Sequence, residues 1–107
     1  MIGVFLKVGE GQGSILEEMH PDSLAEGGTI DIGEFIKGIS SEFLHYQGSL
    51  TTPPCSEIVN WFVLKAPQEI SKAQMEGMEL HWAKHLCSKK NYRVVQPLEG
   101  RTVYKNF

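Results

Sequence analysis

The feature that most constrains this sequence is a proline-containing turn that runs directly into a strongly apolar segment. The turn is GSLTTPPCSE at residues 48–57, and the apolar segment is IVNWFVLK at residues 58–65. Each proline of the turn holds φ at about −65°, and a residue that precedes proline is biased toward extended conformations. The turn is therefore restricted in shape, and it presents the hydroxyls of Thr51 and Thr52 beside the segment that follows.

The segment 58–65 is rich in β-branched and aromatic side chains and contains no glycine or proline, which predicts a β-strand. Alternation along a strand places one set of side chains on one face, namely Glu57, Val59, Trp61, Val63 and Lys65. The opposite face then carries Ile58, Asn60, Phe62 and Leu64. Both faces are largely apolar, which predicts a central strand covered on two sides.

Other segments predict a mainly β chain with short helices, the α+β class. Residues 2–8 and 43–46 read as strands. Pro67 is expected to end the sheet, and a capping box at Ser71 and Gln74 predicts the start of the clearest helix. An apolar stripe on this helix favours packing in a core over a cofactor site, and consists of Met75, Met78, Trp82 and Leu86.

The remaining segments predict short or irregular elements. Capping patterns favour short helices at 15–19 and 31–37. The tail 93–104 predicts extended segments with a turn at residues 99–100. No internal repeat or interdomain linker is present, so we expect a single domain over residues 1–107.

Composition and charge fit a small globular protein and argue against several classes of partner. Hydrophobic residues make up 41% of the 107 residues and charged residues 21%, which are ordinary values. The net charge of −3 gives no reason to expect nucleic acid or an anionic membrane as a partner. No segment is long and apolar enough to predict a membrane span, and residues 1–6 read as a strand rather than a signal peptide.

A resemblance rests on three segments, which are GSLTTPPCSE at 48–57, GVFLKVG at 3–9 and NYRVVQPLEGR at 91–101. Together they resemble the α-class carbonic anhydrases, zinc enzymes that hydrate carbon dioxide. The run 48–57 with Val59 and Trp61 resembles the signature of the family's C-terminal half. The segment GVFLKVG at 3–9 resembles the family strand that follows its third zinc histidine. The segment NYRVVQPLEGR at 91–101 resembles the family's closing NxRPxQPLxxR segment.

The resemblance covers nearly the whole chain, with Val94 where the family usually has proline. It implies a partial α-carbonic anhydrase fold, in which residues 1–107 form the C-terminal part of a large, mostly antiparallel central sheet. The domain would then be a truncated one.

The resemblance also implies a catalytic residue and a substrate pocket. Thr51 matches the threonine that accepts a hydrogen bond from the zinc-bound hydroxide and donates its own hydrogen to a buried carboxylate. Leu50, Val59 and Trp61 match the apolar pocket for carbon dioxide, and Thr52 matches a position that contacts bicarbonate. Without the resemblance, a threonine that caps a turn would be the better interpretation of Thr51, and the apolar side chains read equally as core.

Zinc is the cofactor that the resemblance implies, but its three histidines precede the matching segment in the family. The family's three histidines include an H-x-H pair. This chain has four histidines, which form no such pair: His20, His45, His81 and His85. We expect the complete enzyme to bind Zn²⁺, carbon dioxide and bicarbonate, and this chain alone to bind no zinc because it lacks an N-terminal half. His81 and His85 are spaced to grip a metal from one helix, but Trp82 replaces the glutamate of H-E-x-x-H and no third ligand follows.

Other matching positions suggest structure or history rather than catalysis. Glu57, Arg93 and Gln96 resemble structural positions, for which we expect buried polar contacts. Cys55 matches a position that is disulfide-bonded in secreted relatives, which hints at a secreted or periplasmic parent although no signal peptide is present. The sequence leaves open whether Cys55 forms a disulfide bond with Cys87.

Three functions compete at this point. The first is the C-terminal fragment of an α-carbonic anhydrase, which is inactive alone; the second is a non-catalytic interaction module of the same family; the third is an unrelated histidine metal site. Retention of Thr51 and of the apolar residues around it favours the first. We also expect the isolated chain to be marginally stable, because a central strand without its neighbours exposes unpaired edges.

Overall fold

The computed structural model of the chain describes residues 1–10, 29, 33, 38, 41–85 and 91–107. These residues fall into two compact units. The first comprises Met1–Phe5, Ser40–Ala66 and Asn91–Phe107, and the second comprises Leu6–Ile39 and Pro67–Lys90. Among the helices of the described residues, none is long and apolar enough to cross a membrane.

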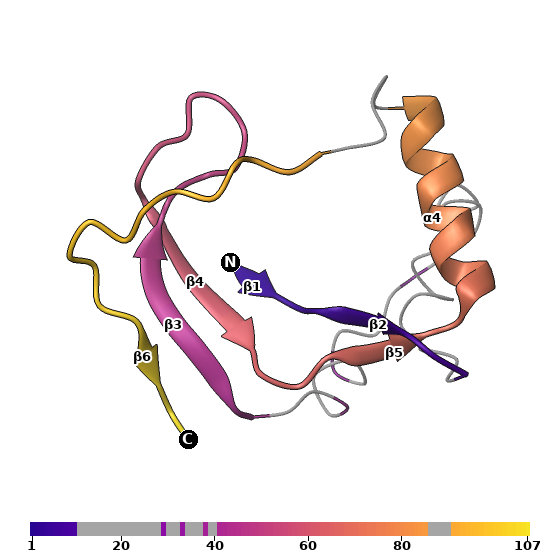
Figure 1. Ribbon diagram of the computed structural model, residues 1–107, viewed down its shortest axis with the longest axis horizontal. Coiled ribbons are helices and arrows are strands. Elements are labelled where there is room, and N and C mark those ends of the chain that lie inside the picture. Colours follow the sequence, from indigo (N-terminus) through magenta and orange to yellow (C-terminus); the bar gives the residue numbers. More distant parts are fainter. Residues whose placement is uncertain (11–28, 30–32, 34–37, 39–40, 86–90) are drawn as a thin grey trace. The chain divides into compact units, whose positions relative to one another are not determined.

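The first unit is built on a four-stranded mixed sheet in the order β1-β4-β3-β6. Its strands are β1 (Ile2–Gly3), β3 (Phe43–Gly48), β4 (Val59–Leu64) and β6 (Tyr104–Lys105). Strand β3 pairs antiparallel with both β4 and β6, whereas β1 pairs parallel with β4. Figure 1 shows β3 and β4 side by side. The strands predicted at 43–46 and 58–65 are thus confirmed, and β4 has the predicted interior position, between β1 and β3.

The register of β3 and β4 decides which side chains share a face of the sheet. Tyr46 pairs with Trp61 and Gly48 pairs with Val59, so these four residues lie on one face, as strand alternation predicts. The expected covering on both faces is not found in the described part of the chain. Of the residues of β4, Leu64 is buried at 7% exposure, while Val59 and Trp61 are half-buried.

The C-terminal tail returns along the free edge of β3. Its turn has left-handed backbone at Glu99 (φ 47°) and Gly100 (φ 81°), which confirms the turn predicted there. Beyond β6, the side chain of Asn106 acts like one more residue of a strand. Its Oδ1 accepts from the backbone N–H of Phe43 at 2.7 Å, and its Nδ2 donates to the carbonyl of Ser41 at 2.7 Å.

The second unit contains a parallel pair of short strands, β2 (Leu6–Val8) and β5 (Gln68–Ile70), and the helix α4 (Lys72–His85). One prediction needs correction here. The single strand expected over 2–8 is divided, because β1 pairs with β4 and β2 pairs with β5. The strand β4 of the four-stranded sheet ends before Pro67, at Leu64, but a further strand that the sequence does not predict, β5, begins after Pro67 in a separate two-stranded sheet. Proline is tolerated just before a strand, where its missing N–H breaks no ladder bond.

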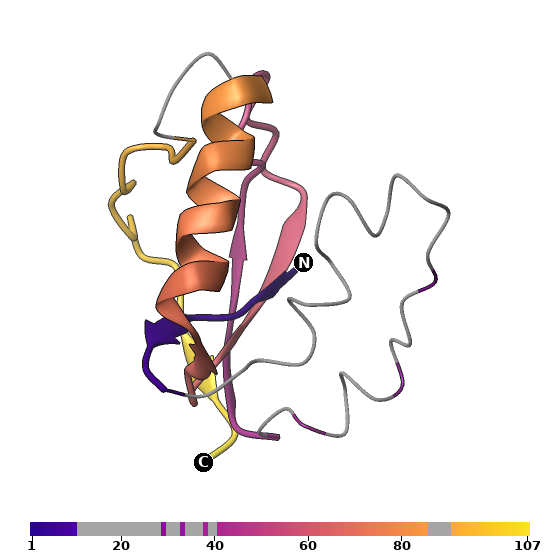
Figure 2. The same ribbon diagram turned by 90° about the vertical axis from the view of Figure 1, so that its right-hand side faces the viewer.

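Helix α4, a single continuous helix in Figure 2, begins as the sequence predicts. The backbone N–H of Ser71 donates to Oε1 of Gln74 at 2.9 Å, and the backbone N–H of Gln74 donates to Oγ of Ser71 at 3.1 Å. This reciprocal pair is a capping box. Ile70, just before it, is buried at 1% exposure.

The predicted apolar stripe of α4 is observed in part. Met75 and Met78 are half-buried. Leu86 and the side chain of Trp82 lie outside the described residues. The short helices expected at 15–19 and 31–37 also lie outside them, apart from Gly33, which is helical.

Candidate functional site

The turn between β3 and β4 is closed by its own backbone hydrogen bonds. The N–H of Leu50 donates to the carbonyl of Ser56 at 3.0 Å, and the N–H of Cys55 donates to the carbonyl of Thr52 at 2.9 Å. The Pro53–Pro54 peptide bond is cis, and Cys55 has left-handed backbone at φ 58°. The turn therefore has the compact shape that its sequence predicts, with Thr51 exposed on it.

Trp61 of β4 is held against this turn. Its indole Nε1 donates to the carbonyl of Ser49 at 3.1 Å. Its ring stacks on that of Tyr46, with centroids 6.5 Å apart and planes inclined by 11°. Gly48 makes room for both rings, because a Cβ there would lie 2.9 Å from Cδ1 of Trp61 and 3.1 Å from Cε2 of Tyr46.

A pocket of about 350 Å³ lies between the hairpin and the tail of the first unit. Thr51 and Trp61 line it from the hairpin, and Arg93, Val94 and Leu98 line it from the tail. The structure thus brings the predicted catalytic threonine and the predicted pocket tryptophan to one cavity with polar and apolar walls.

The other predicted site residues lie near this pocket without lining it. Leu50 and Val59 are half-buried, and Val59 shares the face of β4 that carries Trp61. Thr52 is exposed, and its carbonyl is used in closing the turn. The roles assigned to these residues stay predictions.

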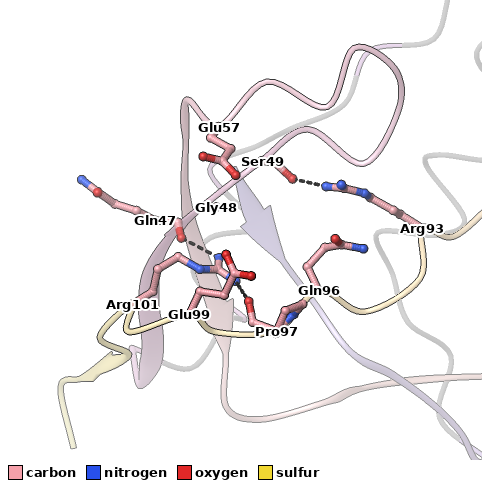
Figure 3. Close-up of a pocket in the computed structure, with 9 residues that line it drawn as sticks. All are labelled: Gln47, Gly48, Ser49, Glu57, Arg93, Gln96, Pro97, Glu99 and Arg101. Atoms are coloured by element: carbon pink, nitrogen blue, oxygen red, sulfur yellow. Dashed lines mark hydrogen bonds between the residues drawn. The ribbon is translucent and has the colours of Figure 1, made fainter.

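A second, more polar pocket of about 370 Å³ is drawn in Figure 3. In that view the guanidinium of Arg93 points toward Ser49, and its Nη1 donates to Oγ of Ser49 at 2.6 Å. Arg101 instead donates to three backbone carbonyls at 2.9–3.0 Å, those of Gln47, Pro97 and Leu98.

The expectation of buried polar contacts is wrong for two of three residues. Glu57 and Gln96 are exposed, and both line the open polar pocket. The amide Nε2 of Gln96 donates only a short local bond, to the carbonyl of Val94 at 2.9 Å. Arg93 is half-buried.

The residues that the structure describes do not fit a zinc site by themselves. Among them, no group of three or more histidine, cysteine, aspartate or glutamate side chains could hold a metal ion. His45 lies on β3, where its ring stacks on Phe62 at 4.6 Å and its Nε2 lies 3.4 Å from Oδ1 of Asn60. His20 and the side chain of His85 lie outside the described residues, so the paired site with His81 stays a hypothesis.

Comparison with known proteins decides the family. The model of the eukaryotic-type carbonic anhydrases matches residues 1–107. The chain belongs to this family, the α-class carbonic anhydrases. Mouse mitochondrial carbonic anhydrase 5B is 34% identical over 119 residues, which cover all of this chain and 37% of the relative. Putative carbonic anhydrase 3 of Caenorhabditis elegans is 33% identical over 111 residues, covering 96% of this chain and 45% of the relative.

Solved carbonic anhydrases also share the fold. A halotolerant carbonic anhydrase from Dunaliella salina superposes with a TM-score of 0.79 at 28% identity, over 99% of this chain and 45% of that one. The α-carbonic anhydrase of Thermovibrio ammonificans, solved with the inhibitor sulfanilamide, gives a TM-score of 0.73 at 37% identity, over 95% of this chain and 45% of that one. This carbonic anhydrase chain therefore has a partial α-carbonic anhydrase fold, and it spans less than half the length of these relatives.

Sequence reasoning missed the residues that hold the site together. The sequence places Ser49 in the turn and Arg93 at a structural position, and it does not indicate that the two residues contact each other. Their contact joins residues 44 positions apart. Gly48 is the one local signal of close packing at this site. It lies at the end of a strand, and its missing side chain leaves room for two aromatic rings.

Proposed function

We propose that this chain supplies the substrate side of an α-carbonic anhydrase active site, in a single domain that also includes residues outside the printed sequence. The reaction of that domain is the reversible hydration of carbon dioxide to bicarbonate and a proton. One observation carries the proposal: within a chain that matches the family along its whole length, the turn with Thr51 is fixed to Trp61 through the carbonyl of Ser49.

The chemistry assigned to Thr51 follows from the hydrogen-bonding capacity of a hydroxyl. A hydroxyl has one donor and two acceptor positions, so a carboxylate partner that takes the donor leaves it as an acceptor toward an attacking hydroxide. Thr51 is exposed at the pocket, where its hydroxyl is accessible to small molecules. Its proposed role is to orient the hydroxide toward the carbon of the substrate.

The substrate pocket is assigned to apolar side chains because carbon dioxide carries no charge and no hydrogen-bond donor. Leu50, Val59 and Trp61 are the residues that we assign to it, with Thr52 as a contact for bicarbonate. The zinc ligands are assigned to histidines outside the printed sequence, and we expect the isolated chain to bind no catalytic zinc.

The first test measures carbon dioxide hydration by the purified 107-residue chain with added zinc, together with the metal content of the same sample. We expect neither activity nor stoichiometric zinc. Activity with one bound zinc per chain would contradict the assignment of the ligands to outside residues.

The second test completes the domain. In a chimera, this chain replaces the matching 45% of the Thermovibrio ammonificans protein, and we expect the remaining part of that protein to supply the zinc-binding histidines. We expect zinc uptake, hydration activity and inhibition by sulfanilamide. Thr51→Val should lower kcat/KM by about 10²-fold at unchanged zinc content, the scale of one oriented hydrogen bond in an active site, whereas Thr51→Ser should retain most activity.

Thr102→Val is the matched control, since Thr102 is also exposed and lies in the tail but lines neither pocket. A chimera that binds zinc but does not hydrate carbon dioxide would instead support the non-catalytic module. Equal activity of Thr51→Val and Thr102→Val would contradict the role of Thr51.

A further inference from the structure

Ser49 lies at the meeting point of three parts of the first unit. Its carbonyl accepts the indole N–H of Trp61 from β4, and its hydroxyl accepts from the guanidinium of Arg93 in the tail. It is also the first residue after β3, within the turn that carries Thr51. The backbone position of Ser49 therefore affects the pocket tryptophan and the threonine together.

The ring of Trp61 has few alternative positions. Tyr46 stacks on one side, and Gly48 leaves just enough space for the ring edge. With the ring stacked in this way, its indole N–H donates to the carbonyl of Ser49, so a change in the direction of that carbonyl would move or release the ring. That carbonyl belongs to the same residue whose side chain Arg93 holds.

The contact between Arg93 and Ser49 is a charge-assisted hydrogen bond. A guanidinium donor carries a full charge, and charge-assisted hydrogen bonds are shorter and roughly twice as strong as neutral ones. The 2.6 Å separation fits that description, and both side chains are part-buried. Lysine, a flexible point charge without the planar fork, would not reproduce the geometry fully.

We propose that Arg93 is a positioning residue for this active site, acting through Ser49 to orient Trp61 and the turn that carries Thr51. The assignment rests on the function proposed above. We assign Arg93 no contact with the reacting atoms. Its effect on the reaction passes through the hydroxyl and the carbonyl of Ser49.

Arg101 provides a matched control. It lies in the same tail, is also half-buried and lines the same pockets. Its three hydrogen bonds go to the carbonyls of Gln47, Pro97 and Leu98, none of them to Ser49. The guanidinium of Arg101 lies 5.9 Å from the ring of Tyr46, which stacks on Trp61. Loss of Arg101 should therefore have a small effect on the Trp61 indole, and the effect of losing Arg93 is compared with it.

The first experiment follows the indole N–H of Trp61 by nuclear magnetic resonance in the chimera, where its signal is the one that Trp61→Phe removes. Arg93→Met and Ser49→Ala should each lower protection of this N–H from exchange by about tenfold. The double variant should lose no more than either single one, because both remove the same link. Arg93→Lys should recover part of the loss, and Arg101→Met should cause little.

Equal protection in Arg93→Met and the parent chimera would overturn the proposal, as would a parent chimera in which the Trp61 indole N–H is unprotected. Equal losses in Arg93→Met and Arg101→Met would also overturn it, because they would show general loosening of the tail.

The second experiment separates this proposal from the proposed function by measuring the same variants kinetically in the chimera. Arg93→Met should lower kcat/KM by about tenfold at unchanged zinc content, with partial rescue in Arg93→Lys. If the chimera hydrates carbon dioxide and Arg93→Met is fully active, the positioning role is wrong and the proposed function stands. If the chimera binds zinc without activity while the indole responds as expected, the proposed function fails and the structural link stands.

Discussion

Gly48 shows how one missing side chain shapes the pocket wall. It ends β3 opposite Val59, on the face where the rings of Tyr46 and Trp61 stack. A Cβ at this position would come within 2.9 Å of the indole, a separation that real Cβ atoms essentially never show. The neighbour is a ring held on two sides, so it has little freedom to move away.

We therefore predict that Gly48→Ala destabilises the chimera by about 1–3 kcal/mol, the usual cost of overpacking, and shifts the emission of Trp61. Urea denaturation followed by tryptophan fluorescence measures both effects. Gly3→Ala is the control in the same sheet, because its Cβ would meet Val63 at an ordinary 3.4 Å. A Gly48→Ala variant as stable as Gly3→Ala would show that the ring can move.

At the scale of elements, helix α4 depends on the cap at its start. Ser71 and Gln74 satisfy two backbone N–H groups reciprocally. The apolar contribution of the helix is limited on its exposed side, where Leu80 is 61% exposed. The cap thus contributes directly to the stability of the first turn.

Ser71→Ala should cost about 1 kcal/mol, within the usual range of roughly 0.5–2 kcal/mol for loss of an N-cap side chain. The free energy of unfolding and the helical circular dichroism of the chimera check this value. Ser41→Ala is the comparison, since Ser41 contributes its carbonyl rather than its hydroxyl to the bond with Asn106. A change below that of Ser41→Ala would contradict the cap's contribution.

The elements that the sequence predicts well are those fixed by neighbouring residues. The capping box of α4, the alternation of β4 and the turn at Glu99–Gly100 each depend on a few adjacent positions. The division of residues 2–8 and the strand after Pro67 depend on pairing between β2 and β5, which lie some sixty residues apart in the chain. Local patterns carry no information about such a partner.

The same distinction applies to the site. Thr51 and Trp61 were identified through a contiguous motif that resembles the family, and the structure places them at one pocket. The contact of Arg93 with Ser49 joins two separate segments, 91–101 and 48–57, and no pattern within either segment indicates it. The exposure of Glu57 and Gln96 was also unpredictable, since it depends on which segments cover them.

At the scale of the whole molecule, the described residues bury little apolar surface. Their buried apolar side chains are Leu64 and Ile70, while fourteen large apolar side chains are at least 40% exposed. Among the latter, Ile58 and Val95 reach 78% and 91%. Exposed apolar surface on this scale is typical of interaction faces and of aggregation-prone proteins.

We predict that the isolated 107-residue chain has marginal stability, with a broad thermal transition and strong binding of the dye ANS, which reports exposed apolar surface. Calorimetry and light scattering on the same sample would test this. The chimera is the comparison, and it should melt more sharply and bind less dye. A sharp, cooperative transition in a monomer of the isolated chain would contradict the prediction.

The amide side chain of Asn106 has a consequence for the chemical ageing of this protein. It holds the tail to β3 by offering one acceptor to the N–H of Phe43 and one donor to the carbonyl of Ser41. Deamidation would convert that donor into a second carboxylate oxygen and set it against the carbonyl oxygen of Ser41. A slow, spontaneous reaction at one side chain would thus repel the tail from the edge of the sheet, and samples stored at alkaline pH would lose this attachment with time.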